Sequence, residues 1–232
     1  MPGFTMLFVW IAGYGLCCSL ERWISVDWLP ENWVAAACMI IYMITLLGWL
    51  YKTGNAKSLG LSRIAKWDIA AWVFWGAAVL LPIYNVLIFS VTTIDLPKML
   101  YMLGVVLAEE LLFRGFFVCK ISQRYGTKSV IISAFIFSLM HIANIATGKS
   151  VEYTIIQVMC AFSAGLCYAA GTLWCRSIVP CIVIHFLTNI TGTDAVNFPG
   201  VDFACAGMIS CIVIQLICGF WLYLKIQKKE SD

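Results

Sequence analysis

Charged side chains are scarce in this sequence of 232 residues. Asp, Glu, Lys and Arg make up 12% of it, whereas soluble domains carry about 25%. Hydrophobic residues make up 62%, and the charges are bunched so that long stretches carry none. This is too little charge to cover a soluble globule of this size. The composition therefore excludes a soluble enzyme, a disordered protein and a basic protein that binds nucleic acid.

The charge-free stretches have the length of membrane-spanning helices. They cover residues 1–20, 32–51, 69–94, 129–148, 153–175, 177–193 and 203–224, and an eighth apolar segment, 99–119, is interrupted by three charges. An α-helix needs about 20 residues to cross a hydrocarbon layer about 30 Å thick. These runs lack the alternation of barrel strands, so helices are expected. The sequence predicts an all-α, multi-pass bundle of about eight transmembrane helices, in one membrane-embedded domain over residues 1–232.

The positions of the basic residues predict an orientation. If the N-terminus is cytoplasmic, eleven of the fifteen Lys and Arg residues lie on the cytoplasmic side and three on the other, while Arg114 lies in the membrane. Cytoplasmic loops of membrane proteins carry just such an excess of Lys and Arg. We therefore expect a protein of the cell membrane, surrounded by the lipid bilayer, with both termini in the cytoplasm.

Three charges inside the segment 99–119 contradict its otherwise apolar character. Glu109, Glu110 and Arg114 lie in one helical stretch, and each costs about 2.5–3.5 kcal/mol at the bilayer centre. Glu110 and Arg114 are four residues apart and share a helix face, so we expect them to form a supporting ion pair. Glu109 points about 100° away and is the spare carboxyl, suited to act as a general base or acid. Taken alone, all three charges could equally form one structural cluster.

Both histidines of the chain also fall inside predicted spans, His141 in 129–148 and His185 in 177–193. Asn189 follows His185 by one helical turn and shares its face. The helical rise places Glu109 roughly 15 Å from the outer end of its span. It places His141, His185 and Asn189 roughly 12–18 Å from the inner ends of theirs. A carboxyl, two imidazoles and a carboxamide should therefore meet near the bilayer midplane, as hydrolysis by an activated water requires.

Several other catalytic signatures are missing. The chain has no Gly-x-Ser-x-Gly elbow, no aspartate pair within a span, no His-Glu-x-x-His and no Gly-rich phosphate loop with a lysine. Its eleven cysteines include no Cys-x-x-Cys, and most lie in spans, where a thiol acts as a small apolar group. Among hydrolytic mechanisms, a water activated by a carboxylate remains.

Three motifs resemble those of a known family. They are Glu-Glu-x-x-x-Arg from Glu109 to Arg114, Phe-x-x-x-His from Phe137 to His141, and His-x-x-x-Asn from His185 to Asn189. In this order, on separate spans, they resemble the CPBP family of intramembrane proteases, also called the CAAX protease and bacteriocin-processing or Abi family, which includes the Rce1-type prenyl-protein endopeptidases. The resemblance covers residues 99–193 closely, and these would be the catalytic helices.

The resemblance implies an endopeptidase that cleaves a membrane-associated protein or peptide precursor, which could be prenylated. In the family's glutamate mechanism, Glu109 and His141 would activate the water, and His185 and Asn189 would hold the oxyanion. Members were also once classed as metalloproteases, and Glu109, His141 and His185 could supply three ligands for zinc. No cofactor is required by the first mechanism. A proton-coupled transporter and a non-catalytic bacteriocin immunity protein are the remaining alternatives.

Overall fold

The computed structural model describes residues 12–16, 33–89, 95–192 and 203–231. Within these ranges the chain is all-helical and has no strands. Its α-helices are α2 (Trp33–Lys52), α3 (Ile69–Phe89), α4 (Leu96–Glu110), α5 (Ser122–Tyr125), α6 (Lys128–Met140), α7 (Val151–Cys175), α8 (Val179–Gly192) and α9 (Phe203–Ser231). Two short 3₁₀ segments, η1 (Lys57–Leu59) and η3 (His141–Thr147), and one π-helical segment, η2 (Leu111–Lys120), connect or extend them. The predicted all-α class is confirmed.

Seven of the eight predicted spans coincide with described helices. Five helical stretches are long and apolar enough to cross a membrane: α2, α3, α6 with its 3₁₀ extension, α7 and α9. Helix α4 and the π-helical segment together continue over 96–120, whereas α8 is shorter, with 14 residues. The first predicted span, 1–20, lies outside the described residues except for 12–16. These helices are those of a multi-pass membrane protein.

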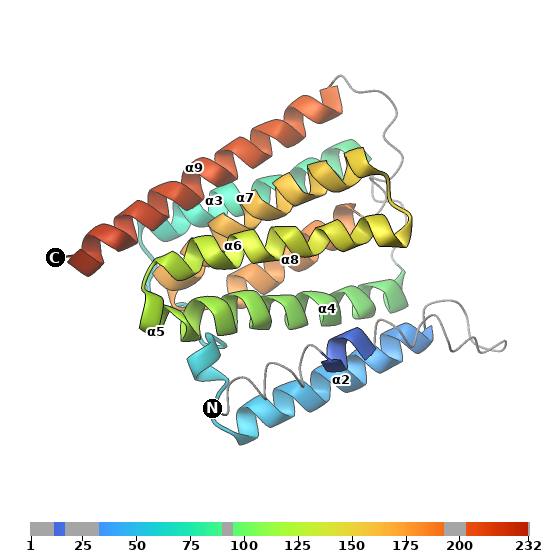
Figure 1. Ribbon diagram of the computed structural model, residues 1–232, viewed down its shortest axis with the longest axis horizontal. Coiled ribbons are helices and arrows are strands. Elements are labelled where there is room, and N and C mark those ends of the chain that lie inside the picture. The colour runs from blue at the N-terminus through green and yellow to red at the C-terminus, as the bar shows by residue number, and fades with distance from the viewer. Residues whose placement is uncertain (1–11, 17–32, 90–94, 193–202, 232) are drawn as a thin grey trace.

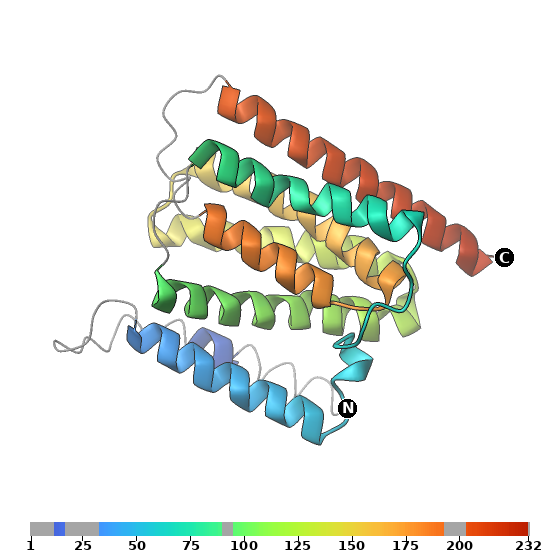
Figure 2. The same ribbon diagram turned by 180° about the vertical axis from the view of Figure 1, so that it is seen from behind.

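The helices pack side by side as one bundle, with α9 and α2 on opposite edges (Figures 1 and 2). Helix α7 is the most buried of the candidate spans and packs against α6, α9 and the π-helical segment. Helix α8 lies between α3 and α4. The main hydrophobic core lies around α7, and includes Phe74, Leu166 and Ile184. Helices α4 and α8 and the η2 and η3 segments carry the polar residues of interest, and each of them packs against other helices of the bundle.

The polar linker after α2 is docked against the turn between α7 and α8. The backbone N–H of Ile178 donates to the carbonyl of Gly60 at 2.9 Å, and the Ser177 hydroxyl donates to the carbonyl of Ser62 at 2.6 Å. Gly60 has a φ of +77°, which a glycine adopts without the steric cost that a side chain brings. The linker is therefore a fixed part of this end of the bundle.

Candidate active site

The two glutamates lie where α4 changes into a π-helical segment. Helix α4 ends at Glu110, and the wider turns continue to Lys120, with the N–H of Ile121 bonded to the carbonyl of Phe116 five residues back, at 3.1 Å. The segment is held from outside, since the Ser133 hydroxyl of α6 donates to the carbonyl of Phe113 at 2.8 Å. Such π-helical turns occur frequently at functional sites.

Glu110 and Arg114 form a fully buried ion pair. The Nη1 of Arg114 donates to Oε1 of Glu110 at 2.8 Å, and neither side chain is exposed to solvent. The guanidinium of Arg114 also lies over the ring of Phe137, at 4.3 Å from the ring centroid. This pairing neutralises two charges that would be costly to bury singly.

His185 reaches both glutamates from α8. Its Nδ1 lies 2.8 Å from Oε1 of Glu110, and its Nε2 lies 3.7 Å from Oε2 of Glu109. Because a carboxylate can only accept, we assign the hydrogen of the shorter contact to Nδ1. This bond fixes the orientation of the imidazole and directs its Nε2 toward Glu109. Glu109 is partly exposed, with 23% of its side chain accessible, whereas Glu110 is completely enclosed.

His141 approaches the same region from the beginning of the 3₁₀ segment after α6. Its Nδ1 lies 3.1 Å from the carbonyl of Phe137, an acceptor, so Nδ1 is the donor and Nε2 is left for other contacts. The ring of Phe137 meets the rings of His141 and His185 edge-on, at centroid distances of 5.1 and 5.8 Å. Phe137 thus contacts both imidazoles.

Asn189 lies one helical turn after His185 on α8 and is partly buried. Its carboxamide forms no hydrogen bond with the part of the chain that the structure describes. The structure therefore brings together Glu109, Glu110, Arg114, His141 and His185, while Asn189 shares only the helix and approximate depth of His185.

The segment that carries the site residues matches a known protein family. Residues 96–191 match the family model described as Type II CAAX prenyl endopeptidase Rce1-like. The matched range runs from the start of α4 almost to the end of α8 and includes all six candidate residues. Residues 96–191 are an Rce1-like domain of the CPBP family. No curated protein and no solved structure matches the chain.

The predicted family is thus confirmed, and the Rce1-like domain belongs to a family of endopeptidases that act on proteins. The domain agrees closely with the range 99–193 that the motifs indicated. The roles of the single residues within it stay predictions.

The Rce1-like domain offers no group of three zinc ligands among its described residues. Among the described residues, no three His, Cys, Asp or Glu side chains form a group that could hold a metal ion. The arrangement of Glu109, His141 and His185 does not fit a three-ligand zinc site, so we derive no step through a metal.

Tyr168 of the Rce1-like domain is a residue that sequence reasoning missed. It is almost completely buried on α7, and its ring centroid lies 5.4 Å from the Arg114 guanidinium and 6.3 Å from the His185 ring. Arg114 is therefore close to two aromatic rings, those of Tyr168 and Phe137, which stabilise its charge. In the sequence, Tyr168 is one aromatic residue in an apolar span, and no pattern distinguishes it from a packing residue.

Proposed function

We propose that the chain is an intramembrane endopeptidase in which Glu109 activates the water that attacks the peptide bond. The single observation that carries the proposal is the contact of His185 with both glutamates, through Nδ1 to Glu110 and through Nε2 toward Glu109. The two neighbouring carboxylates differ: Glu110 is enclosed and paired with Arg114, whereas Glu109 is partly exposed. Only the second is accessible to a water and a substrate.

The proposed reaction is a direct hydrolysis. The Glu109 carboxylate accepts a proton from water while the water oxygen attacks the carbonyl carbon of the substrate, with His141 helping to hold that water. The resulting oxyanion accepts hydrogen bonds from Asn189 and from His185, which in its doubly protonated form donates from Nδ1 to Glu110 and from Nε2 to the oxyanion. As the carbon–nitrogen bond breaks, Glu109 returns its proton to the leaving amine, and the products are an amine and a carboxylic acid.

The surroundings support a substrate that is associated with the membrane. The site lies on α4, on the η2 and η3 segments and on α8, inside a bundle whose outer surface is strongly apolar, with exposed residues such as Ile41, Leu87 and Ile217. A peptide that carries a prenyl group would already be concentrated at the membrane. We therefore propose a prenylated or otherwise membrane-bound peptide as the substrate class, with no metal in the reaction.

The test uses the full chain in proteoliposomes with a fluorogenic prenylated CAAX peptide. Glu109→Gln keeps the shape of the side chain but removes the base, so we expect cleavage to fall at least about 100-fold while the protein stays folded. Glu152→Gln is the matched control, because Glu152 is an exposed glutamate at the start of α7. Full cleavage by the Glu109→Gln variant would contradict the proposal.

A second arm separates the glutamate mechanism from a zinc-dependent one. Metal analysis of the purified protein and treatment with a chelator should leave cleavage by the wild type unchanged. Loss of cleavage on chelation, with recovery on addition of zinc, would favour the metalloprotease. Proton flux without peptide cleavage, abolished by His141→Ala, would instead favour the transporter.

A further inference from the structure

A second candidate site lies at the end of the bundle where α5 and the C-terminal end of α9 meet (Figure 1). It is an open cavity of about 810 Å³, lined by residues of η1, the linker after it, the turn that follows α7, and the last turns of α9. Four cationic side chains line it, Lys57, Lys66, Arg176 and Lys229, and Glu230 is the one carboxylate among its described lining residues. The described side chains that line the cavity therefore carry more positive than negative charge.

Two of these five charges are engaged at its rim. Nζ of Lys66 lies 2.7 Å from Oδ2 of Asp68, so this lysine is largely compensated. Oε2 of Glu230 accepts a hydrogen bond from the backbone N–H of Thr127 at 3.3 Å, just before α6 begins. The positive end of the α6 dipole therefore accounts for part of the charge of Glu230.

The other three cations, Lys57, Arg176 and Lys229, are exposed to solvent at the cavity. Within the described ranges, Lys57, Arg176 and Lys229 form no ion pair. Arg176 is also the one described non-glycine residue with a positive φ, +55°, at the position after α7 where glycine is usual. The Ser62 hydroxyl holds it there by donating to its carbonyl at 2.9 Å. Residues with a strained backbone cluster at functional sites, and Arg176 lies at the cavity.

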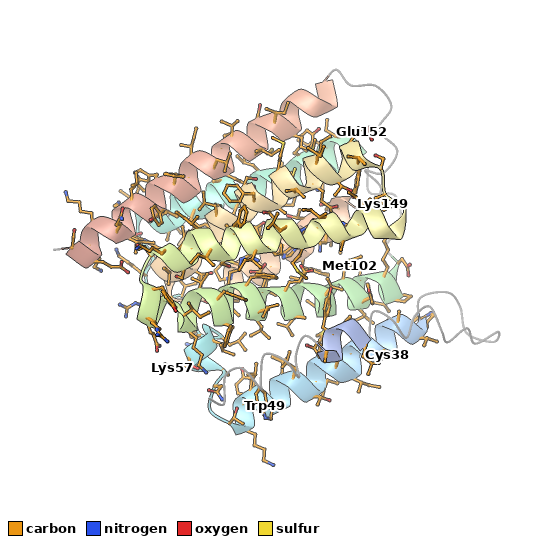
Figure 3. All side chains as sticks on the ribbon, viewed as in Figure 1. Cys38, Trp49, Lys57, Met102, Lys149 and Glu152 are labelled. Atoms are coloured by element: carbon orange, nitrogen blue, oxygen red, sulfur yellow. The ribbon has the colours of Figure 1, made fainter. Side chains whose placement is uncertain are left out.

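The position of the cavity indicates its occupant. Lys57 lies at the opposite end of the bundle from Lys149 and Glu152 (Figure 3), so the cavity is at a helix end and not at the depth of the glutamates. Trp174 lines it, and tryptophan is typical of the boundary between membrane and water. Basic pockets between membrane helices bind phosphate-bearing head groups, for which Lys and Arg are the matching donors. We propose that this cavity binds the phosphate of an anionic phospholipid head group.

The test measures lipid binding directly and does not depend on peptidase activity. The full chain is reconstituted in nanodiscs of phosphatidylglycerol and phosphatidylcholine, and the phosphatidylglycerol that it retains after detergent extraction is counted by native mass spectrometry. Wild type should retain phosphatidylglycerol in preference to phosphatidylcholine. Each cation near a lipid phosphate raises binding about fivefold, so Arg176→Gly with Lys229→Gln should weaken retention about 25-fold.

Two controls keep this result specific. Arg176→Gly removes the side chain at a φ that glycine accepts, so the backbone should be undisturbed. Lys52→Gln with Arg124→Gln removes the same two charge types from exposed positions outside the cavity and should leave retention unchanged. Equal loss in both double variants would overturn the proposal, because it would show a general charge effect. Binding of inorganic phosphate with no preference for phosphatidylglycerol would also overturn it, in favour of a free anion.

Discussion

At the scale of single residues, Glu110 has more than one task. Its Oε1 contacts both Nη1 of Arg114 and Nδ1 of His185, each at 2.8 Å. The arginine pairs with the carboxylate inside the bundle, and the carboxylate in turn holds the imidazole. Glu110 is thus both the counter-ion of Arg114 and the hydrogen-bond partner of His185. Folding of the bundle and the geometry of the site therefore depend on the same side chain.

Arg114 provides the first prediction at this scale. Arg114→Gln leaves the Glu110 carboxylate buried without its main partner, so it should lower the free energy of unfolding by about 3–5 kcal/mol. Glu110→Gln combined with Arg114→Gln removes both charges and should destabilise less than the sum of the single changes. Unfolding in a denaturing-detergent titration measures this, with Arg124→Gln, an exposed arginine, as the control. Strict additivity would contradict a coupled pair.

Asp68 provides a pH-dependent prediction, outside the spans. Lys66 at 2.7 Å, helped by a hydrogen bond from Trp174 at 2.9 Å, holds the pKa of the Asp68 carboxyl well below its usual range. A carboxyl whose pKa is lowered by folding stabilises the protein above its unfolded pKa, and the contribution is lost as the pH falls. The difference in Tm between wild type and Asp68→Asn should be largest near pH 7 and should narrow below about pH 4.

The control for this prediction is Asp95→Asn, because the side chain of Asp95 precedes α4 without capping it. That variant should keep a Tm close to the wild-type value at pH 7. A difference for Asp68→Asn that stayed constant from pH 7 to pH 3 would mean that its charge does not stabilise the fold.

At the scale of helices, small residues decide how closely α7 approaches its neighbours. Ala161, Gly165 and Ala169 are spaced by four residues on α7, and all lie in its packed region. A Cβ on Gly165 would lie 3.2 Å from the Cα of Ala134 and 3.4 Å from the ring of Phe137. The close contact of α6 and α7 therefore depends on the absence of a side chain at this point.

Gly165→Val should consequently lower stability by about 1–3 kcal/mol through overpacking. It should also slow peptide cleavage, because the new methyl groups press on Phe137, whose ring contacts both histidines. Gly76→Val is the matched control, since a Cβ on Gly76 of α3 would meet nothing within 4 Å. Equal Tm values for the two variants would show that α6 and α7 are not in tight contact.

The helices themselves could be predicted from sequence, because a charge-free run of about 20 residues has few other structures available in a membrane. The π-helical segment could not, because it depends on contacts with distant residues such as Ser133, whose hydroxyl bonds to Phe113. The i,i+4 spacing was enough to predict the pairing of Glu110 with Arg114. The contact between Glu110 and His185 was missed because the two residues are 75 positions apart and no local pattern relates them.

At the scale of the whole molecule, charged side chains gather in two separate regions. The cluster around Glu110 lies within the bundle, where Glu110 is paired with Arg114 and contacts His185. The cavity at the end of the bundle holds cations without partners in the described chain. A protein in a bilayer can keep unmatched charge only where water or head groups reach it, so the two regions should differ in their depth.

The orientation of the bundle is the prediction that belongs to this scale. Lys57 and Lys149 lie at opposite ends (Figure 3), and the excess of Lys and Arg at the Lys57 end predicts that this end is cytoplasmic. Green fluorescent protein fused after residue 232 should then fluoresce, and alkaline phosphatase inserted after Lys149 should be active outside. As controls, the reporters are exchanged between the two sites, and both signals should disappear. If the reporter signals were reversed, the basic cavity would lie outside the cell, and the positive-inside assignment would be contradicted. The Lys-rich end of the bundle would then lie on the side of the membrane opposite to the anionic lipids.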